Sequence, residues 1–276
     1  MAALRRGLRA LSTTHRDWRS ARTATAERVL EELGAFDGRD RFETFARRWA
    51  AADDEEALYE AEGQTLRARG DYPGLECRAV RGRPPWADAL ETAAPEIAAE
   101  YAAAPAHEPF FGGEYGASYD GVPLAACGAA VDGAEGAFPR TLAALREVHA
   151  AEGESDALLG GTRLAFFARQ GPRSNVEPHS DLCNFLLTGH LGLDVPDDGE
   201  CALFFMDPAS PPVRWESNTL APLLQTSFRH AAVNDSDRPR AILYFDFFHP
   251  DLRPGERRAL LAFERARRDD EAAFFR

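Results

Sequence analysis

Three residues could hold a metal ion: His179, Asp181 and His230. His179 and Asp181 are two positions apart, and in an extended strand such side chains point to the same face. An imidazole and a carboxylate would then project toward one point. Two histidines and one carboxylate on one face of an octahedral metal are the arrangement of non-haem Fe(II) oxygenases. The residues therefore predict an iron site whose open positions accept a 2-oxo acid and O2.

An arginine lies close enough in sequence to His230 to anchor the 2-oxo acid. Residues 234–239 (NDSDRP) are strong turn formers. If they form a hairpin, His230 and Arg240 face each other across antiparallel strands. A guanidinium pairs with a carboxylate bidentately, which fits the distal carboxylate of 2-oxoglutarate. Arg238 is the alternative anchor, but it falls inside the turn, where solvation is expected.

The elements that must position these residues change character along the chain. In the N-terminal half, apolar residues at helical spacing and helix-forming residues predict helices. Further along the chain, short aromatic or β-branched runs between turn formers predict strands. Such strands favour a sandwich or jelly roll over an alternating α/β fold. The expected helices are residues 24–69, 86–104, 139–151 and 254–275, the last with solvated charges, and the expected strands are 163–169, 184–193, 202–206 and 241–248.

Composition excludes several classes of protein. The net charge of −13 opposes binding to a phosphate backbone, so nucleic acid is not an expected partner. The apolar runs are too short for a membrane span. The four cysteines, which form no C-x-x-C pair, argue against a zinc ribbon or a disulfide-stapled domain and favour a reducing compartment. They are Cys77, Cys127, Cys183 and Cys201. Of these, only Cys183 lies near His179 in the sequence, and we do not expect its thiolate to bind the metal because two histidines and a carboxylate complete the ligand set.

The N-terminal residues 1–23 are rich in arginine, serine and threonine and contain one acid, Asp17. This composition is typical of a mitochondrial or plastid transit peptide. The alternative is a basic amphipathic first helix of the fold, in which case we expect a soluble cytoplasmic protein.

Several segments resemble the aspartyl/asparaginyl β-hydroxylase family. They are YPGLECRAVRGRPPW, GAFPRTLAAL, PHSDLCNFLLTGHLGLDVP and SFRHAAVNDSDRPRAILYFDFFHPDL, and the likeness spans roughly residues 72–252. The resemblance implies a cupin-like double-stranded β-helix (jelly roll) that binds Fe(II) and 2-oxoglutarate. His179 and His230 fall on the family's metal histidines, Arg240 on its 2-oxoglutarate arginine, and His190 on a histidine of the co-substrate pocket.

The chain departs from the family pattern at three positions. The aspartyl/asparaginyl branch has glycine where this chain has Asp181, so the chain looks like relatives with a full triad, which include lipid and free-amino-acid hydroxylases. Thr188 stands where many members carry an arginine near the co-substrate, although its hydroxyl can still donate a hydrogen bond. Ala168 stands where a serine often binds the distal carboxylate.

Three further residues are candidates for the substrate side. The family comparison places Tyr119 and Trp215 there, with core packing as the alternative. Asn184 either points into the pocket or caps its strand.

These inferences define an expected organisation and function. The fold is expected to be mainly β with flanking helices: a possible targeting segment (1–23), a helical region (24–71), the dioxygenase domain (72–252) and a C-terminal helix (253–276). The expected activity is Fe(II)-, 2-oxoglutarate- and O2-dependent hydroxylation of a peptidyl Asp, Asn or Pro residue or of a small molecule. The alternatives are a non-catalytic jelly-roll module that binds a metal or 2-oxo acid and, ranked last, a zinc hydrolase.

Overall fold

The computed structural model describes most of the chain. Residues 1–18, which make up most of the expected targeting segment, and Cys127 lie outside the described part. Among the described residues, no helix is both long and apolar enough to cross a bilayer. The described residues are 19–52, 58–61, 63–104, 108–109, 119–126, 128–152, 164–181, 183–198, 200–207 and 210–274.

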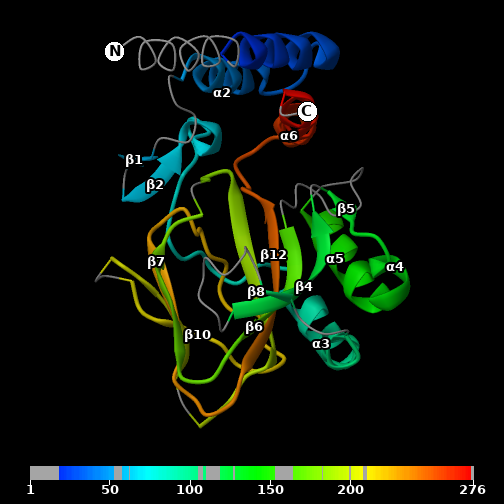
Figure 1. Cartoon of the computed structure of the whole chain (residues 1–276), viewed down its shortest axis with the longest axis vertical. Helices are drawn as coiled ribbons and strands as arrows, with labels where there is room; N and C mark the ends of the chain where they lie inside the picture. Colours follow the sequence, from blue (N-terminus) through cyan, green and yellow to red (C-terminus); the bar gives the residue numbers. More distant parts are fainter. Residues whose placement is uncertain are drawn as a thin grey trace, which may run out of the picture.

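Two antiparallel sheets form the core (Figure 1). The smaller has the order β10-β9-β11-β7 and consists of β7 (Ser174–His179), β9 (Cys201–Phe205), β10 (Val213–Arg214) and β11 (His230–Asn234). The larger has the order β3-β4-β6-β12-β8, with β5 beside β4, and consists of β3 (Glu108–Pro109), β4 (Tyr119–Ala126), β5 (Ala129–Ala130), β6 (Leu164–Gln170), β8 (Leu186–Asp194) and β12 (Arg240–Phe248). Side chains of both sheets share one buried cluster, so the expected jelly-roll core with flanking helices is confirmed.

The larger sheet is covered on its outer face by three helices: α3 (Ala87–Ala102), α4 (Ala134–Ala137) and α5 (Pro139–Ala151) (Figure 1). Strand β12 shows how the two faces divide. Leu243, Phe245 and Phe247 belong to the cluster that includes these helices, whereas Ile242 and Tyr244 pack with the cluster between the sheets. This alternation follows from the two-residue period of a strand. It places every even-numbered residue from 240 to 246 on the inner face.

A third cluster closes one end of the sheets, where residues 19–33, α2 (Arg39–Ala51) and α6 (Pro254–Phe274) gather (Figure 1). Phe263 of α6 packs edge-on against Trp49, with ring centroids 4.7 Å apart. The expectation that the charges of this last helix are solvated is wrong for Arg257 and Arg267, which are buried, and for Glu256, which is fully buried. Its carboxylate accepts hydrogen bonds from Arg41 and from the hydroxyl of Tyr72.

The chain is not helical throughout residues 24–69. After α2 it forms a hairpin of β1 (Leu58–Ala61) and β2 (Gln64–Arg67), followed by the 3-10 turn η1 (Ala68–Gly70). The N–H of Thr65 donates to the carbonyl of Ser227, just before β11. This hydrogen bond joins residues distant in sequence, so tertiary pairing overrides the local helical preference.

The predicted hairpin of residues 230 and 240 is also wrong. Strand β11 pairs with β7 and β9, whereas β12 pairs with β6 and β8, so residues 235–239 cross from one sheet to the other. Asn234 holds this crossing, because its side-chain amide donates to the carbonyls of Gln170, Gly171 and Arg238. The turn formers are therefore used for a change of sheet.

Candidate metal centre and co-substrate pocket

The two histidines face each other across neighbouring strands. His179 is the last residue of β7 and His230 the first of β11, and the antiparallel register pairs them directly. Their ring centroids are 4.4 Å apart. Cross-strand pairing of this kind brings side chains on one face into contact.

Both imidazoles are oriented in the same way by the backbone. Nδ1 of His179 lies 2.8 Å from the carbonyl oxygen of Glu177, and Nδ1 of His230 lies 2.9 Å from that of Phe228. A carbonyl oxygen only accepts hydrogen bonds, so each Nδ1 carries the proton and the lone pair of each ring that can bind a metal is on Nε2. Burial also lowers the pKa of His230, which favours its neutral, metal-binding form.

Asp181 reaches the same place by a different route from the one predicted. Strand β7 ends at His179, so strand alternation does not aim the carboxylate. Instead the N–H of Asp181 donates to the carbonyl of Thr226 at 2.8 Å. The hydroxyl of Ser180 donates to the backbone carbonyl of Ser227 at 2.6 Å. These bonds tie the segment after β7 to the residues that precede β11.

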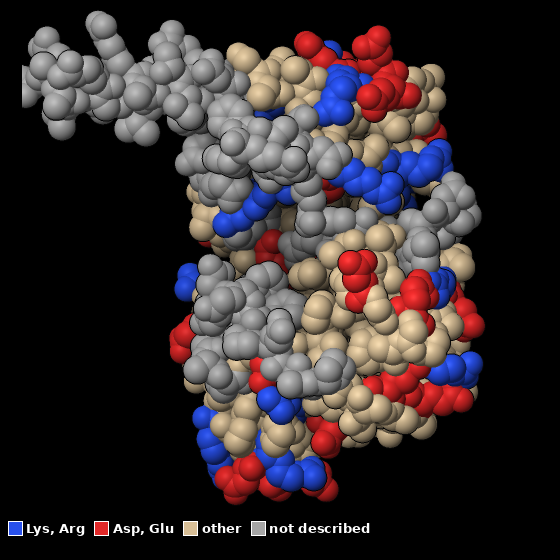
Figure 2. All heavy atoms as spheres, turned by 45° about the vertical axis from the view of Figure 1, so that its right-hand side comes forward, with Lys and Arg blue, Asp and Glu red and all other residues tan. Residues whose placement is uncertain are grey.

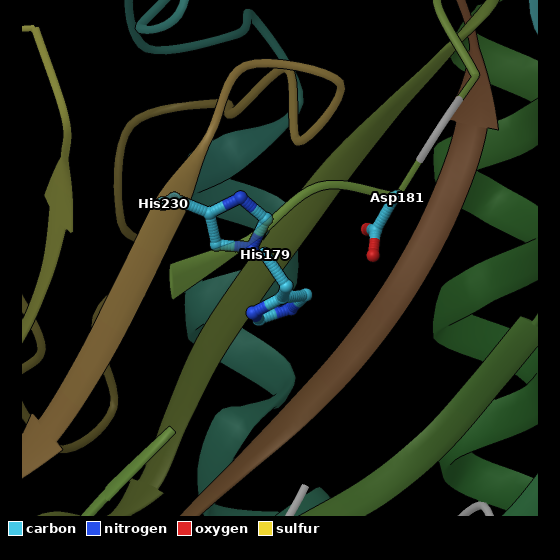
Figure 3. A group of neighbouring side chains, drawn as sticks. All are labelled: His179, Asp181 and His230. Carbon is cyan, nitrogen blue, oxygen red and sulfur yellow. The ribbon is translucent and has the colours of Figure 1, made fainter. Parts of the chain in front are cut away.

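The three side chains point toward a common space (Figure 3). One possible ligand atom from each of His179, Asp181 and His230 lies within 4.8 Å of the others. Ligands at right angles around a metal, with bonds of about 2.1 Å, are about 3 Å apart, so small side-chain rotations would allow all three to bind one ion. Cys183, by contrast, packs with the aromatic cluster at the end of the sheets.

The side chain of Arg240 is buried at the start of β12. It is 1% exposed, its Nη2 donates to the side-chain oxygen of Gln170 at 2.6 Å, and its guanidinium carbon lies 4.1 Å from the ring centre of Trp215. Its Nε and Nη1 are buried and have no hydrogen-bond partner among the described residues. A buried guanidinium with two free donors is unfavourable until an anion binds, and burial accordingly lowers the pKa of Arg240.

His190 provides a second buried donor, beside Trp215. Its Nδ1 accepts a hydrogen bond from the indole N–H of Trp215 at 3.2 Å, so the ring proton is on Nε2. Nε2 is buried without a hydrogen-bond partner in the described part of the chain. Burial, assisted by the charge of Arg240, lowers the pKa of His190 to about 3 and keeps the ring neutral. His190 and Arg240 together offer donors suited to a carboxylate.

The remaining co-substrate candidates differ in what they offer. The hydroxyl of Thr188 lies 3.1 Å from that of Thr226 and 3.5 Å from the Asp246 carboxylate, so it already has partners within the protein. Ala168 is fully buried in β6 and contributes no polar group.

The three substrate-side candidates lie in different environments. Tyr119 pairs across strands with Gln170, and burial raises its pKa to about 12. Trp215 contacts Arg240 and His190, so it lies among the candidate co-substrate residues. Both ends of the Asn184 amide bind the backbone of Tyr72, so Asn184 ties two segments of the fold together.

Sequence reasoning missed three polar residues of this interior: Gln170, Tyr244 and Asp246. The hydroxyl of Tyr244 donates toward carboxylate oxygens of Asp181 at 3.3 Å and of Asp246 at 3.1 Å. For Tyr244 and Asp246 the sequence did contain a signal: they follow Arg240 at even spacing, so all three lie on the same face of one strand. It could be used only once the inner face of the strand was known.

Comparison with known proteins identifies similar sequences in one family. The model of the aspartyl/asparaginyl beta-hydroxylase family matches residues 91–250. The human and mouse proteins called aspartyl/asparaginyl beta-hydroxylase are each 34% identical to this chain over 91 residues. That match covers 33% of this chain but only 11% of the human protein and 12% of the mouse protein.

The solved structures that are similar to this chain include two oxygenases. A 2OG-Fe(II) oxygenase family member from Burkholderia pseudomallei has 17% identity and a TM-score of 0.40, covering 55% of this chain and 77% of that one. A prolyl-4-hydroxylase from Pseudomonas putida has 19% identity and a TM-score of 0.40, covering 59% and 87%. Because the family model spans more than half of the sequence, this chain belongs to the aspartyl/asparaginyl beta-hydroxylase family.

Proposed function

We propose that this protein is an Fe(II)- and 2-oxoglutarate-dependent dioxygenase, with His179, Asp181 and His230 as the iron ligands. The observation that carries the proposal is the convergence of three ligand groups whose two imidazoles both present Nε2. Two histidines and one carboxylate suit non-haem iron and leave positions open for a co-substrate and O2. When bound, iron with 2-oxoglutarate and O2 supplies the oxidant for hydroxylating an unactivated C–H bond.

The buried donors of Arg240 suit a carboxylate of 2-oxoglutarate. Arg240 would hold the distal carboxylate through Nε and Nη1, which have no hydrogen-bond partner among the residues that the structure describes, while Gln170 fixes the orientation of the guanidinium. His190, held by Trp215, would donate from Nε2 to the co-substrate. The protein's own task is to hold the reactants in place and keep water out. Buried aromatic walls such as Phe166 and Phe205 serve the second purpose.

The substrate is part of the proposal. Aspartyl/asparaginyl beta-hydroxylases are named for a reaction on Asp and Asn residues, so a peptidyl Asp or Asn residue is the class we favour first. A peptidyl Pro residue or a small molecule is the second class that we propose. Nucleic acid is disfavoured by the net charge of −13. Figure 2 shows acidic and basic side chains interspersed on the face it presents. We place the protein in a soluble intracellular compartment, cytoplasmic or organellar.

A turnover assay tests the proposal directly. The protein is incubated with Fe(II), ascorbate and 2-oxoglutarate labelled at C1, and the release of labelled CO2 is compared with that of His179→Ala. We expect release that requires Fe(II) and O2 and falls to background in the variant, whose folding is checked by its thermal unfolding midpoint. Release equal to that of the variant would favour a non-catalytic binding module, for which the partnered Thr188 and the apolar Ala168 are the supporting features. Hydrolytic activity without O2 would indicate a zinc hydrolase.

A further inference from the structure

A closed ring of polar contacts includes Asp181, one of the proposed iron ligands. The hydroxyl of Tyr244 reaches Oδ2 of Asp181 at 3.3 Å and Oδ1 of Asp246 at 3.1 Å. The hydroxyl of Thr188 lies 3.5 Å from the same oxygen of Asp246 and 3.1 Å from the hydroxyl of Thr226. The carbonyl of Thr226 then accepts the N–H of Asp181, which closes the ring.

The sheet fixes the far side of this ring. Tyr244 and Asp246 are on the inner face of β12, and the register with β8 sets Tyr244 opposite His190 and Asp246 opposite Thr188. The ring of Tyr244 stacks on Phe166, with centroids 4.6 Å apart and an interplanar angle of 27°. The phenol is thus held by packing on a central strand. It approaches Asp181 from a rigid element.

Asp181 needs an external support of this kind. The regular pairing of β7 ends at His179, so the sheet sets the direction of that imidazole but not that of the carboxylate. A carboxylate that binds a metal through one oxygen needs a donor at the other, and such partners of metal ligands typically change metal affinity by about 10- to 100-fold. Figure 3 shows Asp181 beyond the end of its strand, beside a long strand of the larger sheet.

We propose that Tyr244 is a positioning residue. Its phenol donates a hydrogen bond to Oδ2 of Asp181 and so orients this carboxylate toward the two histidines. The inference rests on the proposed function. A phenol carries one proton and here faces two carboxylates. Thr188 can donate to Asp246, and Thr226 can donate to Thr188, so the proton of Tyr244 remains available for Asp181. This also gives Thr188 a role in completing the ring.

Metal binding tests the inference without any turnover. Tyr244→Phe removes only the hydroxyl and keeps the stacked ring. We expect this variant to bind Co(II) about tenfold more weakly than the wild-type protein, with a changed visible absorption of the bound ion. The matched control is Tyr101→Phe, which removes a phenol from α3, where the ring packs on Phe167 in the outer cluster. The control should bind Co(II) as the wild-type protein does.

A double-mutant cycle separates positioning from a general structural effect. If Tyr244 acts through Asp181, Tyr244→Phe should have no further effect on Co(II) affinity in an Asp181→Ala background. An equal loss in both backgrounds would overturn the inference, as would wild-type affinity and spectrum in Tyr244→Phe alone. If the wild-type protein itself fails to bind Co(II), the proposed function is contradicted and the inference falls with it. Wild-type binding with no effect of Tyr244→Phe refutes the inference alone.

Discussion

Replacing Arg240 with methionine should abolish tight binding of 2-oxoglutarate while leaving the fold intact. Methionine keeps an unbranched apolar stem next to Trp215 but removes the guanidinium. In the wild-type protein Nε and Nη1 are buried and lack partners among the described residues, whereas Nη2 is already bonded to Gln170. The variant therefore removes two donors that are available to a bound carboxylate.

The magnitude follows from those two donors. A buried hydrogen bond to a charged group contributes about 1.5–3 kcal/mol, so losing two costs about 3 kcal/mol or more of binding free energy. Since about 1.4 kcal/mol is a factor of ten, the dissociation constant should rise at least about 100-fold. The ligand-free protein should behave in the opposite way. Removing a buried charge that has no ion-pair partner in the described part of the chain relieves desolvation, so the unfolding midpoint should not fall.

Calorimetric titration of 2-oxoglutarate into the Mn(II)-loaded protein measures the first effect, and thermal unfolding measures the second. Arg238→Met is the matched control, because Arg238 is the alternative anchor and lies in the crossing between the sheets. Its affinity should equal that of the wild-type protein. Unchanged binding in Arg240→Met, or an equal loss in Arg238→Met, would refute the assignment of the pocket.

Two predictions concern stability. His190 is buried with a pKa of about 3, against an ordinary value of 6.5. As the pH falls below 6.5 the unfolded chain takes up a proton that the folded protein does not, so this residue should reduce the free energy of unfolding by about 2 kcal/mol at pH 5. His190→Gln should remove that part of the pH dependence in urea unfolding. Burial raises the pKa of Glu256, but hydrogen bonds from Arg41, the Arg253 backbone and Tyr72 outweigh it, so the net pKa is lowered. Glu256→Gln should therefore cost about 2–3 kcal/mol at pH 7, a difference that disappears as the pH falls through that lowered pKa.

Each of these two predictions has a clear contrary result. Identical pH slopes in the wild-type protein and His190→Gln would mean that the folded protein takes up the proton as readily as the unfolded chain does. For the C-terminal helix, Glu264→Gln is the control, because the Glu264 carboxylate is 26% exposed and pairs with Arg267 within the same helix. It should change stability by less than about 1 kcal/mol. An equal effect of both substitutions would show that burial of Glu256 adds nothing.

Residue type and local spacing were sufficient for much of this protein. They indicated four strands of the β-core, β6, β8, β9 and β12, and the helices 86–104 and 139–151. They also indicated the residues His179, Asp181, His230 and Arg240, which the fold brings to one interior. Strand alternation and helical periodicity are local properties, and the donor types that suit iron or a carboxylate are chemical ones. Neither needs knowledge of distant contacts.

The tertiary structure decided how those residues meet. Arg240 reaches the interior from β12 of the larger sheet, whereas His230 belongs to the smaller one, so their expected pairing in a hairpin was wrong. Asp181 is placed by the carbonyl of Thr226 after its strand has ended. Tyr244 could be recognised only from the register of the larger sheet, which sets it opposite His190. Strand pairing and the choice of buried face depend on the energy of whole sheets packing together, which no local segment of the sequence contains.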